Sequence, residues 1–286
     1  MIFFFENGRL GNQLFQYYGL KNYFPEHTLF FFGCDSLKEM FNNTTAKFFY
    51  FKKNNILRLI KKVFFFLARI KIIGTINEQL FPSNISSSNF KIIIQKGLFK
   101  KIFLADRIYF QDKKCVNKIN NNLFLRRNIL LKAQYWLKKK NIFKKSNLIF
   151  VHIRRGDFLS WPDPKYSASL DLAWYLKSMS YLKNKFKSPI FILMSDDYFF
   201  LKKNFKNSKN LIICNKSIEI SFAIMTMCSH GILSASSFSW WASYFIKTRN
   251  LDKKKSFFIA PKFWAGHRIK KWLPYKNFIF YWLSYR

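Results

Sequence analysis

The chain has few acidic residues, few cysteines and little glycine or proline. Only 14 of its 286 residues are Asp or Glu, against 50 Lys and Arg, so the formal net charge is +36. Such a basic surface attracts polyanions, among them nucleic acid, anionic lipid and phosphorylated small molecules. The four cysteines show neither CxxC nor Cys/His ligand spacing, and there are only four histidines, so a structural zinc site is not expected. This cysteine pattern indicates a reduced, intracellular setting.

Long apolar runs are also missing. No segment reads as a membrane span, and no basic region precedes Met1–Phe5 as it would in a secretory signal. The best candidate for lipid contact is Val63–Ile73, which Arg69 and Lys71 interrupt. It is interpreted as a buried or interfacial basic amphipathic segment. We therefore expect a cytoplasmic protein that makes peripheral contact with the anionic inner face of the membrane and does not cross it.

Aromatic residues are abundant, and half of all residues are apolar. The chain contains 37 Phe, 14 Tyr and 8 Trp, or 21% of the sequence. A chain of this length and composition can bury a sizeable core, as one large α/β domain or as two halves. The excess of Phe together with Lys, Asn and Ile indicates biased coding as well as selection, so positions carry more information than counts.

The first thirty residues predict a β-α-β unit. Ile2–Phe5 and Leu29–Phe32 are apolar runs typical of strands. Asn12 is a plausible N-cap for a helix over Gln13–Tyr23, which Pro25 ends. Residues 40–145 alternate basic, Asn-rich stretches with short apolar runs and are harder to interpret. Leu130–Lys140 predicts a helix.

From residue 148 onward, apolar runs and helical patterns alternate regularly. This rhythm predicts a doubly wound parallel sheet. The expected strands are Leu148–Ile153, Ile190–Met194, Leu211–Cys214, Ile232–Leu233 and Phe257–Ala260, and the helices between them include Leu170–Lys183, Ile218–Cys228 and Ser237–Ile246. We place the domain boundary between residues 146 and 147, giving domains 1–146 and 147–286.

Two adjacent arginines follow the first of these strands. In open α/β sheets, ligands bind beyond the carboxyl ends of the strands. Arg154 and Arg155 lie at such an end, followed by Gly156 and Asp157. A guanidinium fork can grip a diphosphate, and Gly156 permits close backbone approach. The alternative is a structural Arg–Asp pair at a turn, and His152 can equally be a hydrogen-bonded core residue.

Two further polar segments follow later strands. Asp196 and Asp197 come after Ile190–Met194 and can bind a ligand or cap a helix, or divide these tasks between them. The Ser-rich run Ser234–Trp241 precedes a predicted helix, whose N-terminus is favourable for an anion. Helix capping alone also explains that run.

The N-terminal segment Gly8–Gln16 places an Arg between glycines, after a strand and before a helix. Its spacing differs from the dinucleotide fingerprint G-x-G-x-x-G. Arg9, Asn12 and Gln13 are expected to face a ligand-binding cleft, where they contact one or the other of two substrates, acceptor or donor.

Taken together, Gly8–Gln16, His-x-Arg-Arg-Gly-Asp at 152–157, Ser195–Asp197 and Ser236–Trp241 resemble the bacterial α-1,2-fucosyltransferases of glycosyltransferase family 11. Ile259–Lys262 fits the same pattern. The resemblance covers roughly residues 1–20 and 148–262.

The resemblance implies two Rossmann-like domains of the GT-B type. It implies transfer of L-fucose from GDP-β-L-fucose to the 2-hydroxyl of a galactose-containing oligosaccharide, with inversion and with neither metal nor other cofactor. The implied donor site comprises His152, Arg154, Arg155, Asp196, Asp197, Ser236, Ser237 and Phe238. Arg154 would contact the diphosphate, and Arg154 and Asp157 are the catalytic candidates, with Asp163 as another nearby carboxylate.

Two departures from the family pattern bear on the identity of the sugar and leave the diphosphate grip intact. Ile218–Met225 keeps only Glu219 where the family is rich in acids, and Gly231–Ala235 replaces the commoner Ile-Ile-Ala-Asn. One alternative is a related glycosyltransferase with a different sugar nucleotide or linkage. Another is a non-catalytic protein that binds nucleic acid or a membrane surface, although no nucleic-acid-binding module is recognised and no specific nucleic acid partner is expected.

Overall fold

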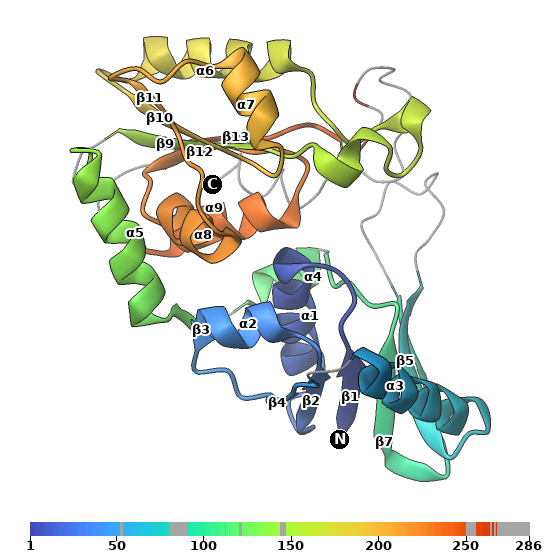
Figure 1. Cartoon of the computed structure of the whole chain (residues 1–286). Coiled ribbons are helices and arrows are strands. Elements are labelled where there is room, and N and C mark those ends of the chain that lie inside the picture. Colours follow the sequence, from blue (N-terminus) through green and yellow to red (C-terminus); the bar gives the residue numbers. More distant parts are fainter. Residues whose placement is uncertain are drawn as a thin grey trace. The chain divides into compact units, whose positions relative to one another are not determined.

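The chain forms two compact units, residues 1–126 and 127–286, each with its own sheet. The computed structural model describes residues 1–51, 54–79, 91–111, 113–119, 122–143, 147–249, 256–263, 265 and 267 (Figure 1). The boundary lies before α5 (Arg127–Lys139), not after residue 146 as expected. Helix α5 joins the second unit because it packs against α8 (Ile218–Thr226).

The first unit is built on a six-stranded sheet. Its order is β4 (Lys47–Phe49), β2 (Leu29–Phe32), β1 (Ile2–Phe5), β7 (Phe99–Asp106), β5 (Ile73–Gln79) and β6 (Lys91–Gln95). Neighbouring strands are parallel except β5 and β6. The predicted strands Ile2–Phe5 and Leu29–Phe32 are confirmed. Smaller elements are α2 (Asp35–Met40), α4 (Lys113–Asn117) and the antiparallel pair β3 (Phe41–Asn42) and β8 (Phe124–Leu125).

Helices cover both faces of this sheet because phenylalanine occupies both. Tyr17 of α1 (Leu10–Tyr23) packs on Phe31, with ring centroids 6.2 Å apart. On the opposite face, Phe64 of α3 (Asn54–Arg69) packs on Phe3 at 4.6 Å. Phe3 also stacks on Phe30 of the neighbouring strand at 5.0 Å. Contacts between phenylalanine rings of neighbouring strands and of α3 therefore make up much of this core.

Helix α1 begins earlier than predicted. It starts at Leu10 with Arg9 in the N-cap position, so the prediction of Asn12 as the cap is wrong. Gly8 has φ +93°, and this turn brings the chain directly from β1 into the helix. Leu10 is buried, so its packing extends the helix by a turn at the N-terminal end. The side chain of Asn12 instead accepts a hydrogen bond from Gln111 Nε2 at 3.0 Å.

The second unit contains the predicted parallel sheet. Its order is β11 (Leu211–Ile213), β10 (Ile190–Ser195), β9 (Leu148–Ile153), β12 (His230–Ile232) and β13 (Phe258–Ile259). The helices are α5, α6 (Leu172–Lys185), α7 (Tyr198–Asn204), α8 and α9 (Ser237–Arg249), and short 3-10 turns span Gly156–Leu159 and Pro164–Tyr166. Strand β9 is buried along its whole length, which explains its unbroken apolar run.

Within the part of the chain that the structure describes, no helix combines the length and apolarity needed to cross a bilayer.

Candidate functional site

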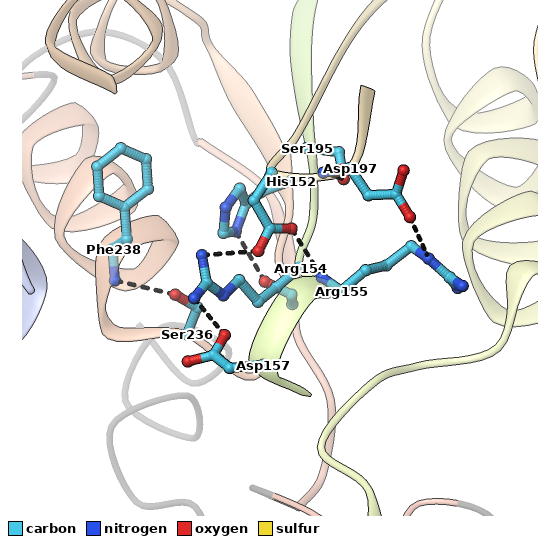
Figure 2. A network of polar contacts seen from close by, with 10 residues as sticks. His152, Arg154, Arg155, Asp157, Ser195, Asp197, Ser236 and Phe238 are labelled. Carbon is cyan, nitrogen blue, oxygen red and sulfur yellow. Dashed lines mark hydrogen bonds and ion pairs between the residues drawn. The ribbon is translucent and has the colours of Figure 1, made fainter. Parts of the chain in front are cut away.

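The register of the second sheet brings Arg154 and Asp196 together. Strands β9 and β10 run parallel with Ile153 opposite Ser195, so the next residue of each strand lies at the same sheet edge. Arg154 Nη1 lies 2.8 Å from Asp196 Oδ2. Figure 2 shows the Arg154 side chain within this network, with a dashed contact to Asp157. The backbone N–H of Arg155 donates to the other oxygen, Asp196 Oδ1, at 2.8 Å. Asp196 thus ties the Arg-Arg turn to the end of the neighbouring strand.

A second carboxylate holds the same guanidinium. Arg154 Nη2 contacts Asp157 Oδ1, three residues along the chain. The Arg154 side chain is only 12% exposed, whereas that of Asp157 is 53% exposed. The guanidinium is therefore fixed between a partly buried partner, Asp196, and a solvent-facing one. The Arg154–Asp157 contact is the Arg–Asp pair expected if this turn is purely structural. The same contact fixes the orientation of the guanidinium, as a ligand site also requires.

Gly156 is required for this arrangement. A Cβ at this position would lie 2.5 Å from Asp196 Oδ2, closer than van der Waals contact allows. Any side chain here would push the Asp196 carboxylate away from Arg154. The sequence predicts that Gly156 permits close approach to its backbone. In the structure, the group that approaches is the Asp196 carboxylate of the same unit.

Arg155 and Asp197 form a second pair. Arg155 Nε donates to Asp197 Oδ2 at 3.2 Å, and its guanidinium lies 3.9 Å above the ring of Phe200. Asp197 also caps α7, because its Oδ1 accepts from the backbone N–H of Phe200 at 2.9 Å. The expectation that one aspartate of the pair caps a helix is confirmed for Asp197. Phe200 was not singled out from the sequence, where an aromatic three residues after a cap is unremarkable.

These contacts gather scarce acidic residues at one sheet edge. Two arginines meet three aspartates, and the local balance is 2 − 3 = −1 in a chain whose net charge is +36. Partly buried charges of this kind are stable only when each is paired and hydrogen-bonded. The sheet edge is therefore a pre-organised ionic network within a basic protein.

His152 lies behind this network, in the core. Its Nδ1 is 2.7 Å from Ser234 Oγ, and its ring centroid lies 5.5 Å from that of Phe238. Burial and, to a smaller extent, the positive charge of Arg154 together lower the pKa of His152 to about 3. The imidazole is consequently neutral at physiological pH. This geometry is that of the hydrogen-bonded core residue, and a direct role of His152 in donor binding stays a prediction.

The Ser-rich turn begins α9. Ser236 Oγ accepts from the backbone N–H of Phe238 at 3.3 Å, as a helix cap does. Ser237 is the first residue of the helix. The ring of Phe238 packs 5.1 Å from that of Phe222. Because β12 pairs with β9, this turn follows a strand adjacent to the one that carries Arg154. The structure thus collects the predicted donor-site residues of the second unit at one end of its sheet.

Tyr175 of α6 is a further residue of this region that sequence analysis missed. Its side chain is fully buried. Burial raises the pKa of Tyr175 well above its usual value, while the backbone of Arg154 opposes the rise. Nothing in the sequence marks it, because an aromatic residue on an amphipathic helix is most often part of the core.

The predicted residues of the first unit surround the end of β1. Gln13 is buried and its Nε2 donates to Glu6 Oε1 at 2.7 Å and to the carbonyl of Gly8 at 3.2 Å. Burial raises the pKa of Glu6, with Asp35 adding to the rise. Arg9 lies at the start of α1. The buried side chain of Gln13 therefore holds the loop from Glu6 to Gly8 by hydrogen bonds. That Arg9, Asn12 and Gln13 face the cleft stays a prediction.

Among the residues that the structure describes, no three His, Cys, Asp or Glu side chains converge as a metal site.

Comparison with known families gives one match over almost the whole chain. The model of the family described as Glycosyl transferase family 11 matches residues 4–272. This is the family that the sequence motifs resemble, so that prediction is confirmed.

Curated relatives include bacterial and mammalian enzymes. The O-antigen biosynthesis glycosyltransferase WbnK of Escherichia coli is 25% identical over 93% of this chain and 95% of its own length. An α-1,2-colitosyltransferase of Escherichia coli is 29% identical over 49% of this chain and 48% of its own. Galactoside α-(1,2)-fucosyltransferase 1 of Sus scrofa is 27% identical over 35% of this chain and 29% of its own. The chain thus spans the full length of the first and half or less of the other two.

Solved structures show the same fold. POFUT1 in complex with GDP-fucose matches with a TM-score of 0.55 and 12% identity, over 90% of this chain and 97% of that one. NodZ α-1,6-fucosyltransferase soaked with GDP-fucose matches with a TM-score of 0.50 and 13% identity, over 86% and 92%. The predicted α/β class, with two Rossmann-like domains of the GT-B type, is confirmed.

Proposed function

This chain belongs to glycosyl transferase family 11, and we propose that it transfers L-fucose from GDP-β-L-fucose to the 2-hydroxyl of a galactoside in a cell-surface glycan. The observation that carries the proposal is the guanidinium of Arg154, fixed at the end of β9 between Asp196 and Asp157. The names of its relatives support the sugar and the linkage: several are galactoside α-1,2-fucosyltransferases, and structural neighbours were crystallised with GDP-fucose or GDP.

Arg154 is proposed to act on the departing diphosphate. As the bond to the sugar breaks, negative charge grows on the β-phosphate and the sugar becomes oxocarbenium-like. A fixed guanidinium aimed at that charge stabilises the transition state more than the ground state, without reorganising during the reaction. Asp196 holds Arg154 from the sheet side. The more exposed Asp157 is the partner that can give way when a diphosphate approaches.

The neighbouring residues are proposed to hold the rest of the nucleotide. Backbone N–H groups at the start of α9, around Ser236 and Ser237, are suited to phosphate oxygens because they begin a helix of 13 residues. Arg155, stacked on Phe200, orients the turn or shares the diphosphate contact. Asp196 and Asp197 are proposed to contact guanine or ribose with the lone pairs that their present hydrogen bonds leave.

Inversion requires the acceptor hydroxyl to attack from the face opposite the diphosphate. We propose that the first unit supplies the acceptor side, through the segment with Arg9, Asn12 and Gln13. Asp157 remains the candidate carboxylate for the proton of that hydroxyl. Asp157→Asn separates its two roles, because the amide retains a hydrogen-bond acceptor for Arg154 but is not a base.

A second candidate is transfer of a sugar other than fucose, favoured by the colitosyltransferase among the relatives. Binding of GDP, UDP and GDP-fucose, compared by NMR or thermal shift, separates donor classes. Incubation with GDP-fucose and a panel of β-galactosides, followed by linkage analysis, then tests the proposed reaction. A Fuc-α-1,2-Gal product supports it. Tight GDP binding without fucose transfer to any acceptor of the panel supports the second candidate.

A further inference from the structure

Helix α3 is apolar on two sides, and only one of them is used inside the first unit. Its inner side packs on the sheet through Leu57, Ile60 and Phe64, against rings that include Phe3 and Phe32. Figure 1 shows α3 lying along the β5 and β7 side of this unit, at its outer surface. The other apolar side faces away from this core.

The outward side is a continuous apolar stripe. Its members are between 47% and 63% exposed and follow one another at intervals of three and four residues: Ile56, Leu59, Val63, Phe66 and Ile70. This spacing keeps Ile56, Leu59, Val63 and Phe66 on one face of the helix, and Ile70 continues the row just past its last residue, over about 21 Å at 1.5 Å per residue. A single exposed apolar residue is ordinary, but an aligned row of five indicates a surface that binds something.

The stripe continues beyond the end of the helix. The backbone N–H of Leu98 donates to the carbonyl of Lys71 at 2.7 Å, and that of Phe99 donates to Ile72 at 2.9 Å. Leu98 is 74% exposed and Phe99 53% exposed. The turn into β7 thus adds two large apolar side chains beside the C-terminal end of α3.

The charged residues of the segment that carries the stripe are all positive. Residues 54–71 contain no Asp or Glu, and their cations are exposed at Arg58, Lys61, Lys62, Arg69 and Lys71. An apolar face flanked by Lys and Arg is the pattern of helices that lie in the interface of anionic membranes. The apolar side chains enter the acyl boundary while the cations meet lipid phosphates.

We propose that the α3 stripe, defined as Ile56, Leu59, Val63, Phe66 and Ile70, docks this chain on an anionic lipid bilayer. A second copy of the chain fits the same face poorly. Two apposed stripes would bring their flanking cations together with no acidic partner on either helix, and like charges so placed repel. A bilayer that carries phosphate headgroups complements both the apolar row and its rim.

The test is co-sedimentation of the full chain with vesicles. We expect binding to vesicles of phosphatidylcholine mixed with phosphatidylglycerol, and binding about tenfold weaker or more to phosphatidylcholine alone. The double variant Leu59→Gln/Phe66→Gln should lower partition to the mixed vesicles about tenfold or more, because it removes two central apolar contacts. Leu59→Trp keeps an apolar side chain suited to the interface and should retain binding.

A matched control lies on α5, whose exposed Leu131 and Tyr135 are also surrounded by lysines. Leu131→Gln/Tyr135→Gln should leave partition unchanged. Circular dichroism checks that all variants are folded. An equal loss in both double variants, retained binding in Leu59→Gln/Phe66→Gln or no binding to anionic vesicles would overturn the proposal. A dimer that the α3 variant dissociates without change in vesicle binding would identify the stripe as a protein interface instead.

Discussion

Replacing Arg154 by lysine tests the central element of the site. Arg154 makes two separate charge-assisted contacts, one from Nη1 to Asp196 and one from Nη2 to Asp157. Lysine carries one compact ammonium and cannot span both carboxylates and also present a planar fork to a diphosphate. The substitution keeps the charge, so any loss reports geometry.

The expected magnitude follows from the number of contacts. Loss of one hydrogen bond between charged groups costs about 1.5–3 kcal/mol. Removal of a donor aimed at transition-state charge lowers kcat by about 100- to 1000-fold. We therefore expect kcat/KM with GDP-fucose to fall by about 100-fold or more. The free energy of unfolding should fall by about 3 kcal/mol at most, leaving the protein folded.

The assay is initial-rate kinetics with varied GDP-fucose, together with calorimetric titration of GDP. The matched variant is Arg155→Lys, at the same strand end, which loses a stack on Phe200 and one bond to Asp197. Because Arg155 is proposed to orient the turn or to share a contact that Arg154 makes in the main, its lysine variant should lose about tenfold or less. Near-native turnover of Arg154→Lys, or equal losses in the two variants, would refute the assignment of the diphosphate to Arg154.

Three further predictions concern the metal, the glycine and pH. Activity should persist in excess EDTA; a loss that Mg²⁺ or Mn²⁺ restores would contradict a metal-independent reaction. Gly156→Ala should destabilise the protein by about 1–3 kcal/mol and lower activity, because its Cβ displaces Asp196; unchanged denaturation curves and rates would show that the turn accommodates a methyl group. His152 should contribute about 2 kcal/mol to the fall in the free energy of unfolding between pH 7 and about pH 5, because it stays neutral when folded but takes up a proton when unfolded, with a pKa of about 6.5. In denaturant titrations His152→Gln should flatten this slope, and an unchanged slope would place the proton uptake elsewhere.

Regular, buried elements could be predicted from the sequence, whereas boundaries set by tertiary contacts could not. Strands Leu148–Ile153 and Ile190–Ser195 are buried on both faces, so their apolar runs are unbroken and easily recognised. The start of α1 was missed because local capping preference favours Asn12, while burial of Leu10 determines where the helix begins. The amphipathic segment Val63–Ile73 covers only the second half of α3, and its last residue, Ile73, already starts β5, so the sequence did not show where this helix begins and ends.

The candidate site also divides into a part that the order of the motifs predicts and a part that depends on tertiary structure. The order of the motifs along the chain was sufficient to gather Arg154, Asp157 and Asp196 at one sheet edge. Which aspartate meets which arginine depends on the register of β9 and β10, and the sequence does not encode that register in any local pattern. The capping role of Asp197 followed from ordinary helix chemistry. No pattern in the sequence marked Tyr175, because its place in this region depends on how α6 packs in the folded unit.

The phenylalanine-rich strands of the first unit are prone to aggregate before folding is complete. Ile2–Phe5 and Leu29–Phe32 are short, uncharged and rich in a residue that favours strands, which is the composition of segments that aggregate. In the folded unit β1 is paired on both edges, and α1 and α3 cover its two faces. Until those helices dock, repulsion between chains of net charge +36 is what keeps such strands apart. The excess of lysine therefore also protects nascent chains, and high salt during refolding should remove that protection.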